Sequence, residues 1–460
     1  MLRALQASCR RKSRGKLPGS WRSAGARLDA ARIDSGPRLA LNRPADPCTF
    51  RAVTRGILLL VLGAAAVFSA CGSDDGDGGS SSGGSGTGAA SSGGAGGAAG
   101  SAGSGGTSSG GTSSGGTSSG GSGATDGSAG GDGSSSDAGG DTASSDAGPA
   151  ALCFQKQFVN PPKLSLDYDQ FGPTVGTHCK GTNHQKIENI QRVVFLGDSV
   201  TVGTPPSNIN PGNVYRAILS SMLAAHFKIA APGLGWGGAD PLKGVALPSE
   251  SGAFVSCAKW GARTDDLMKD SQQVETCIPP NKRNLKHLVI MTVGGNDISA
   301  ITQDGGGTAP KKTLPELWQD TKDFVNLLRQ TVEWLKNPVN VPGGVDVVFG
   351  NNYEFTDGTG DVTACPGVQL GGIQPWQDKK AQADMVIWAN EQYLKIAVDT
   401  KSDMIFMLES FCGHGYKRND PTSPCYRGPN QALWFDLTCI HPSNEGHVAL
   451  ADLFFKTITE

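Results

Sequence analysis

The sequence has no apolar stretch long enough to cross a bilayer, and its 11 cysteines include no Cys-x-x-Cys pair. A transmembrane helix needs about 20 consecutive apolar residues, whereas the apolar run at residues 57–70 has 14. Without closely spaced cysteine pairs, a zinc cluster is not expected. Residues 72–150 also contain no aromatic side chain and no Val, Ile, Leu or Met. This segment therefore has no apolar side chains whose burial would offset the entropy of ordering it.

Residues 72–150 consist almost wholly of Gly, Ser, Ala, Thr and Asp. The unit GGTSS recurs at positions 105, 110 and 115, which is low complexity and too short for a structural repeat. A flexible chain of this length has an end-to-end reach of roughly 50 Å. We therefore predict a disordered tether over 72–150, followed by a folded domain over 151–460.

The run at 57–70 has the length of a signal-peptide core and follows a charged flank. It ends in Phe68-Ser69-Ala70-Cys71, which resembles the lipobox of bacterial lipoproteins, although Phe stands where Leu is usual. The resemblance implies that residues 1–71 form a leader removed before Cys71, and that Cys71 is lipidated. An ordinary secretory cleavage site and a short buried helix are the alternatives. The expected location is the bacterial cell envelope, at the outer membrane or cell surface.

Residues 1–55 hold 13 Lys and Arg against 3 Asp and Glu. Such a basic arm could bind nucleic acid, but in an exported protein it would be an overlong leader that is discarded. The rest of the chain has 27 basic and 39 acidic residues, a net charge of −12, which argues against a nucleic-acid partner. We expect membrane contact through the lipid anchor only.

The folded part retains eight cysteines, an even number that is typical of disulfides in an exported domain. They lie at positions 153, 179, 257, 277, 365, 412, 425 and 439. Eight cysteines allow 105 pairings, so we predict only two local pairs, Cys257 with Cys277 and Cys412 with Cys425.

Residues 151–460 suffice for one sizeable domain, which we expect to be a monomer. Apolar runs that read as buried strands alternate with amphipathic stretches that read as helices. The runs begin at residues 192, 253, 287, 345 and 403, and the helical stretches begin at 213, 314, 376 and 443. This alternation predicts an α/β fold, a three-layer α/β/α sandwich around a parallel sheet of about five strands. In such sheets, sites form at the carboxyl ends of the strands.

Small or polar residues follow four of these strands, in the order Ser199, Gly261, Asn296 and His441. Ser199 stands in Gly-Asp-Ser directly after the first run, and Asn296 in Gly-Gly-Asn-Asp after the third. The ordered set resembles the SGNH (GDSL-type) hydrolases, over residues 190–460. The resemblance implies their flavodoxin-like sandwich and a catalytic serine.

A serine hydroxyl becomes a nucleophile when a base takes its proton, and histidine is the side chain that titrates near neutrality. The resemblance assigns Ser199 as nucleophile and His441 as base. It also assigns an oxyanion hole to the backbone N–H groups of Ser199 and Gly261 and the side-chain amide of Asn296. Taken singly, Ser199 could cap a helix, Asn296 could lie in a turn, Gly261 in a bend and His441 in a solvated loop.

The acid of the triad is where the sequence departs from the family. The family places an Asp three residues before the His, and that position is Thr438 here. Asp436, five residues before His441, could reach the imidazole through a bulge enforced by a disulfide at Cys439. Alternatively, a backbone carbonyl of Thr438 or Cys439 orients the ring.

These residues predict a serine esterase that cleaves carboxylic esters through an acyl-enzyme intermediate at the cell surface. Alternatives on the same fold are a carbohydrate O-deacetylase and a lipase or lysophospholipase, so the substrate is a small-molecule, glycan or lipid ester. A non-catalytic surface-binding module is the alternative of another class. No metal or organic cofactor is implied. The long loops at 204–252 and 351–374 are expected to shape the substrate pocket.

Overall fold

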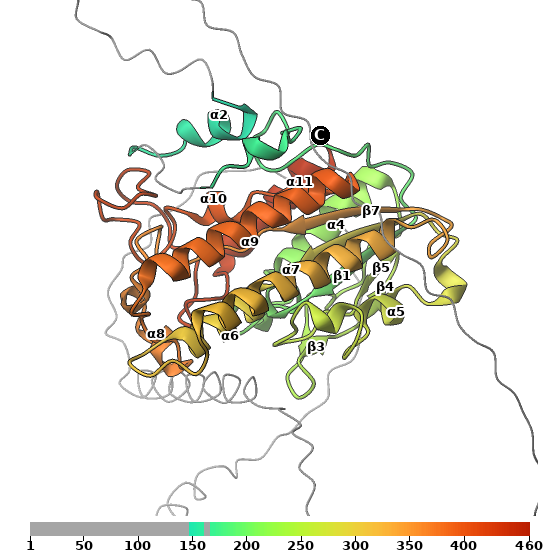
Figure 1. The fold of residues 1–460 in the computed structure, drawn as a ribbon. Coiled ribbons are helices and arrows are strands. Elements are labelled where there is room, and N and C mark those ends of the chain that lie inside the picture. The colour runs from blue at the N-terminus through green and yellow to red at the C-terminus, as the bar shows by residue number, and fades with distance from the viewer. Residues whose placement is uncertain (1–146, 161–165) are drawn as a thin grey trace, which may run out of the picture. The chain divides into compact units, whose positions relative to one another are not determined.

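The computed structural model of the protein describes residues 147–160 and 166–460 (Figure 1). The predicted leader, the lipidation site Cys71 and nearly all of the predicted tether lie outside these residues. The described part contains a six-stranded sheet in the order β4-β5-β1-β6-β7-β8, and a separate two-stranded sheet of β2 and β3. The strands are β1 (Arg192–Gly197), β2 (Ala239–Asp240), β3 (Val245–Ala246), β4 (Glu250–Ser251), β5 (Phe254–Ser256), β6 (His287–Thr292), β7 (Val345–Gly350) and β8 (Asp403–Ile405).

All five predicted strands are present, and they pair in parallel. Every residue of β1, β6 and β7 is buried, as expected for a sheet covered on both faces. The predicted number of strands was too low by one, because β4 pairs antiparallel with β5 at the edge of the sheet. This short strand has no apolar run, since its two residues are Glu250 and Ser251.

Helices cover both faces of the sheet. They are α2 (Pro149–Gln155), α3 (Ser199–Val202), α4 (Tyr215–Phe227), α5 (Gln273–Cys277), α6 (Gly295–Gly305), α7 (Leu314–Lys336), α8 (Pro366–Leu370), α9 (Lys379–Thr400), α10 (Met407–Phe411) and α11 (Asn444–Ile458). Figure 1 shows α7 and α9 running side by side, and these two helices pack against each other. Helices α4 and α11 form a second packed pair.

Side chains of the central strands alternate between two hydrophobic cores. In β1, Val194 and Leu196 join the core that contains α7 and α9. Val193 and Phe195 join the core that contains α4 and α11. Because successive side chains of a strand point to opposite faces, these contacts place one helix pair on each face. The predicted three-layer α/β/α sandwich is therefore confirmed.

Four disulfides join the eight cysteines of the described domain, at Cys153–Cys179, Cys257–Cys277, Cys365–Cys439 and Cys412–Cys425. Both predicted local pairs are among them. In the part of the chain that the structure describes, no helix has the length and hydropathy needed to span a membrane.

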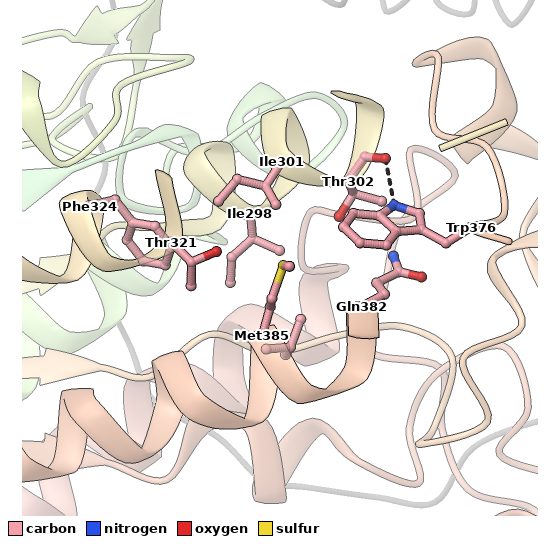
Figure 2. Close-up of a pocket in the computed structure, with 9 residues that line it drawn as sticks. Ile298, Ile301, Thr302, Thr321, Phe324, Trp376, Gln382 and Met385 are labelled. Carbon is pink, nitrogen blue, oxygen red and sulfur yellow. Dashed lines mark hydrogen bonds between the residues drawn. The ribbon is translucent and has the colours of Figure 1, made fainter. Parts of the chain in front are cut away.

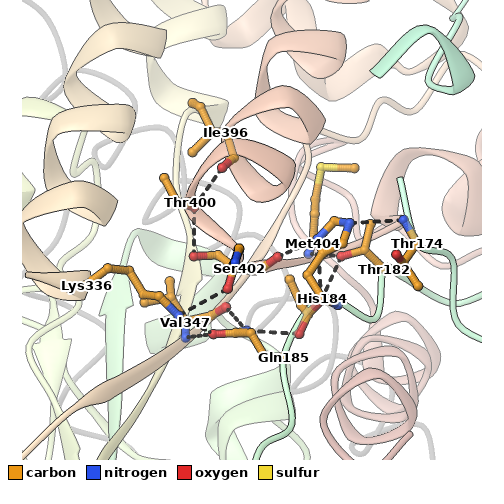
Figure 3. Close-up of polar contacts among 12 residues, drawn as sticks. Thr174, Thr182, His184, Gln185, Lys336, Val347, Ile396, Thr400, Ser402 and Met404 are labelled. Carbon is orange, nitrogen blue, oxygen red and sulfur yellow. Dashed lines mark hydrogen bonds and ion pairs between the residues drawn. The ribbon is translucent and has the colours of Figure 1, made fainter. Parts of the chain in front are cut away.

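A polar strap over residues 174–185 covers the outer edge of β8 (Figure 3). The Asp403 carboxylate accepts hydrogen bonds from the Thr182 hydroxyl at 3.0 Å and the His184 backbone N–H at 2.7 Å. The His184 ring donates from Nδ1 to the Ser402 carbonyl at 2.8 Å. Lys336 donates to the Gln185 side-chain oxygen at 2.8 Å. The Thr182 backbone N–H also donates to the Met404 carbonyl at 2.9 Å, so the strap occupies backbone groups that an open sheet edge would expose.

Candidate active site

The turn after β1 presents Ser199. Gly197 has φ = +116°, and a Cβ there would lie 1.9 Å from the Thr292 carbonyl oxygen, so only glycine fits. The next residue, Asp198, caps α3 by accepting the Val200 backbone N–H at 3.0 Å. Ser199 is the first residue of this short helix and is 8% exposed. The sheet and the cap thus hold the serine backbone in one position.

Asp198 lies in a buried polar network. Its carboxylate also accepts the Thr292 hydroxyl at 3.2 Å, and that hydroxyl lies 2.7 Å from the Thr201 hydroxyl. Burial raises the pKa of Asp198 to about 7. This residue joins β1, α3 and β6 behind the serine.

Ser199 and His441 lie in direct contact, with 2.9 Å between Oγ and Nε2. The loop that carries His441 is fastened by hydrogen bonds from the Asp436 N–H to the His441 carbonyl and from the Ser443 N–H to the Trp434 carbonyl. Ser443 then caps α11 by accepting the Gly446 N–H. Burial lowers the pKa of His441 to about 4. The imidazole is therefore neutral at pH 7 and able to accept a proton.

The other side of the imidazole meets Thr438. His441 Nδ1 lies 2.8 Å from the Thr438 hydroxyl, which in turn hydrogen-bonds the Asp436 carboxylate at 2.5 Å. The Thr438 backbone N–H donates to the same carboxylate oxygen at 2.8 Å. Burial raises the pKa of Asp436 to about 6.

The sequence left two alternatives for the group that orients His441, the Asp436 carboxylate and a backbone carbonyl. Neither makes the observed contact with Nδ1. Among the described residues, Asp436 forms no hydrogen bond or ion pair with the His441 ring, and the ring bonds a side-chain hydroxyl rather than a backbone carbonyl. The signal that could have found this group is the position of Thr438, three residues before the histidine. A hydroxyl at that position can bridge the ring and a carboxylate farther back.

The three groups predicted to form the oxyanion hole each have an N–H available for a further hydrogen bond. The backbone N–H groups of Ser199 and Gly261 have no hydrogen-bond partner in the part of the chain that the structure describes. Gly261 has φ = +75°. The Asn296 side chain donates one N–H to the Ala262 carbonyl at 2.9 Å, which leaves its second N–H available.

The next residue, Asp297, ties the Gly261 loop to α6. Its carboxylate accepts the backbone N–H and the hydroxyl of Thr264, both at 3.1 Å. Burial raises the pKa of Asp297 to about 7. Gly294, just before α6, has φ = +105°, and a Cβ there would collide with the Tyr393 hydroxyl. These contacts set the position of Asn296 at the start of α6.

A cavity of about 630 Å³ opens at these groups. Ser199, Asn296 and His441 line it, whereas Gly261 does not and is connected to it through Ala262 and Asn296. The loop at 351–374 lines the cavity, as predicted. No residue of 204–252 does, so the prediction for that loop was wrong. Part of this loop is instead held by Arg216, whose guanidinium donates to the Gly238 carbonyl at 3.1 Å and to the Trp236 carbonyl.

The cavity extends from Ser199 between α6 and α9. Apolar side chains of both helices line this part, including Ile298 of α6 and Val386 and Ile387 of α9. A second, very small void of about 10 Å³ lies next to it and shares Ile298, Thr302, Gln382 and Val386 with it. Figure 2 shows the aromatic and apolar side chains around this void, with Trp376 donating to the Thr302 carbonyl at 2.9 Å.

Comparison with known proteins identifies a family for most of the folded domain. Residues 195–449, more than half of the chain, match the sequence model of the GDSL-like lipase/acylhydrolase family. No curated protein matched the sequence. Among solved structures, phospholipase A1 from Streptomyces albidoflavus is 16% identical, with a TM-score of 0.35, over 58% of this chain and 98% of that one. An acetylxylan esterase from Geobacillus stearothermophilus is 18% identical, with a TM-score of 0.34, over 60% and 97%. An extracellular lipase from Streptomyces rimosus is 17% identical, with a TM-score of 0.35, over 57% and 98%.

Proposed function

The chain belongs to the GDSL-like lipase/acylhydrolase family and is an SGNH-type ester hydrolase, and from this premise we propose that it works through an acyl-enzyme intermediate on Ser199. The observation that carries the proposal is the 2.9 Å contact between Ser199 Oγ and His441 Nε2, at a cavity that Asn296 also lines. The four residues Ser199, Gly261, Asn296 and His441 also argue against a surface-binding module, which would have no use for them.

The reaction runs in two stages. Ser199 Oγ bonds to the ester carbonyl carbon while His441 Nε2 takes the hydroxyl proton, and the carbonyl oxygen becomes an oxyanion. The Ser199 N–H and the Asn296 amide, which belong to residues that line the cavity, donate to this oxyanion. The bond to the alcohol oxygen then breaks, and His441 returns its proton to the departing alcohol. A water molecule, deprotonated by His441, releases the acid in the same way and restores Ser199.

We also propose that the enzyme is exported and anchored to the cell envelope through Cys71. The apolar run at 57–70, the cysteine that follows it and the tether composition of 72–150 support this location. The four disulfides support it independently, because disulfides persist in oxidising compartments.

One labelling experiment tests the mechanism and the anchor together. Bacteria expressing the full chain are treated with a fluorophosphonate probe, which reacts with activated serines, and are then separated into membrane and soluble fractions. We expect labelling of the wild-type chain in the membrane fraction and none of Ser199→Ala. For Cys71→Ser, the labelled protein should leave the membrane fraction. A folded wild-type chain that does not label would refute the nucleophile, and a Cys71→Ser chain that stays in the membrane fraction would refute the anchor.

For the substrate, we propose an ester with an apolar acyl chain. The cavity that opens at Ser199 has room for more than an acetyl group. Between α6 and α9, Ile298, Val386 and Ile387 give it an apolar wall, beside polar and charged residues of α9 such as Lys380 and Asp384. Burial of each methylene contributes about 0.8 kcal/mol, or about a fourfold gain in kcat/KM per methylene. This favours the lipase or lysophospholipase alternative over the carbohydrate O-deacetylase.

A series of p-nitrophenyl esters tests the acyl site. We expect kcat/KM to rise from acetate to octanoate, and Val386→Trp, which fills the extension, to lower octanoate hydrolysis at least tenfold. The same variant should hydrolyse acetate at nearly the wild-type rate, which serves as the control for folding. A wild-type enzyme that prefers acetate would instead support the deacetylase alternative.

A further inference from the structure

An unusual chain of contacts runs behind the catalytic histidine. Ser199, His441, Thr438 and Asp436 follow one another through side-chain hydrogen bonds, so a neutral hydroxyl stands between the imidazole and the carboxylate. Asp436 and His441 are both at least nine-tenths buried. The second carboxylate oxygen of Asp436 is buried without a hydrogen-bond partner among the described residues. The carboxylate is thus oriented mainly by Thr438.

Only one arrangement of the hydrogens in this series of hydrogen bonds lets His441 act as the base. His441 must accept the Ser199 proton at Nε2, so its own proton is on Nδ1 and is donated to the Thr438 oxygen. The Thr438 hydroxyl has a single hydrogen, which it donates to Asp436. If that hydrogen turned toward the ring instead, Nδ1 would be the acceptor and Nε2 would carry the proton. His441 could then no longer act on Ser199.

Contacts from other parts of the fold hold the loop that carries these hydrogen-bonded residues in place. The Tyr416 hydroxyl donates to the Asp436 carbonyl at 2.7 Å, and the Tyr353 hydroxyl donates to the Ile440 carbonyl at 2.6 Å. Cys439, between Thr438 and His441, is joined by its disulfide to Cys365. The surrounding fold therefore fixes the positions of Asp436, Thr438 and His441 relative to one another.

We propose that Thr438 is a positioning residue that relays the orienting effect of Asp436 to His441, in place of the direct carboxylate contact usual in the family. This proposal rests on the proposed function of Ser199 and His441. The Asp436 carboxylate holds the Thr438 hydrogen away from the ring, and the Thr438 oxygen holds the Nδ1 proton. When His441 becomes an imidazolium, its positive charge is stabilised through the hydroxyl, and the proton stays on the ring.

The relay makes a specific prediction for the acidic side of the pH profile. Burial places the pKa of Asp436 at about 6 and that of His441 at about 4. Above pH 6 the carboxylate is ionised and can orient Thr438, whereas below it the carboxyl group is neutral while His441 is still a free base. We therefore expect kcat/KM to fall as the pH drops through about 6, well before His441 itself is protonated.

Other ionisable groups also face this site and must be separated from Asp436. Asp198 lies next to Ser199, with a pKa that burial raises to about 7. His447 interacts electrostatically with His441, and burial lowers the pKa of His447 to about 3. The Tyr353 hydroxyl, which donates to the Ile440 carbonyl next to His441, has a pKa that burial raises. Of the ionisable groups at this site in the described residues, Asp436 and His441 are bonded to Thr438. Replacing Asp436 therefore identifies the source of a decline near pH 6.

Substitutions at Thr438 test the hydroxyl. Thr438→Val keeps the size and removes both hydrogen bonds, so we expect kcat for p-nitrophenyl butyrate to fall about 10²-fold with little change in KM. Thr438→Ser keeps the hydroxyl, and its kcat should stay within about threefold of wild type. If the two variants have equal kcat, the proposal is wrong. Thr438→Ser is also the matched control, because it removes a methyl group from the same half-buried site and keeps the hydroxyl.

Asp436→Asn tests the charge. The amide oxygen can still accept from Thr438, but no negative charge remains, so we expect about a tenfold loss of kcat. The fall in kcat/KM near pH 6 should disappear and leave only the decline of His441 at lower pH. A fall near pH 6 that remains in Asp436→Asn would overturn the relay, because it would then arise from another group such as Asp198.

A double-mutant cycle tests whether Asp436 acts on His441 through Thr438 or independently of it. If Asp436 acts through Thr438, the variant with both Thr438→Val and Asp436→Asn should be about as active as Thr438→Val alone. Independent effects would instead multiply to about a 10³-fold loss, which would contradict the relay. Failure of the proposed function appears differently, because the wild-type enzyme itself would then show no turnover and no labelling at Ser199.

Discussion

At the scale of single residues, Asn296 has two structural tasks. One N–H of its side chain is bonded to the Ala262 carbonyl, and the other is free on the side of the cavity. The first bond fixes the plane of the amide, and the second N–H can then be donated without a search for the right rotamer. A fixed donor of this kind stabilises charge that develops only during the reaction.

Asn296→Ala is therefore expected to lower kcat by about 10²–10³-fold with KM almost unchanged. Asn296→Asp, of equal size, should lose more, because a carboxylate would repel the oxyanion. Steady-state kinetics with a short p-nitrophenyl ester measure both effects, and the melting temperature checks that the loop at Ala262 remains folded. A variant with raised KM and normal kcat would show that Asn296 binds the ground state rather than the oxyanion.

Residue identity alone predicted part of the site and missed the rest. Ser199 and Asn296 could be recognised because each follows a strand within a Gly-rich motif, and the geometry brings Ser199 and His441 together at 2.9 Å. The group on Nδ1 could not be assigned, since both a carboxylate two residues farther back, which we favoured, and a backbone carbonyl fitted the sequence. Only the path of the loop shows that the Thr438 hydroxyl lies between ring and carboxylate.

At the scale of elements, strands buried on both faces were the easiest to predict. The runs that became β1, β6 and β7 are buried along their whole length and mostly apolar, because both faces are covered by helices. Strand β4 was missed for the opposite reason. It is a two-residue edge strand of Glu250 and Ser251, and its pairing with β5 depends on main-chain hydrogen bonds that leave no pattern in the sequence.

The cavity between α6 and α9 also could not be predicted from the sequence. The periodicity of residues 376–399 predicts one buried face for α9, but the same apolar side chains can pack against a core or line a cavity. Val386 and Ile387 do the latter, because α6 and α9 leave a space between them. Loop composition was equally ambiguous, since 351–374 lines the cavity and 204–252 does not.

At the scale of the whole molecule, disulfides connect segments that are distant in sequence. Cys365 lies in the 351–374 loop that lines the cavity, and Cys439 lies between Thr438 and His441. This one bond therefore joins the wall of the substrate cavity to the loop that carries the base. Cys153–Cys179 instead joins α2 to the strap that covers β8, and neither of its cysteines lines the cavity.

Removing these two disulfides should have similar effects on stability and different effects on activity. Sequence separations of 74 and 26 residues correspond to about 4.5 and about 3.5 kcal/mol of unfolding free energy in the chain-entropy account. We therefore expect Cys365→Ala with Cys439→Ala, and Cys153→Ala with Cys179→Ala, to lower the free energy of unfolding by comparable amounts in urea titrations. Only the first pair should also lower kcat at a temperature where both proteins remain folded, because it frees the segment between Asp436 and His441. If kcat fell equally in both variants, the Cys365–Cys439 bond would contribute only to stability.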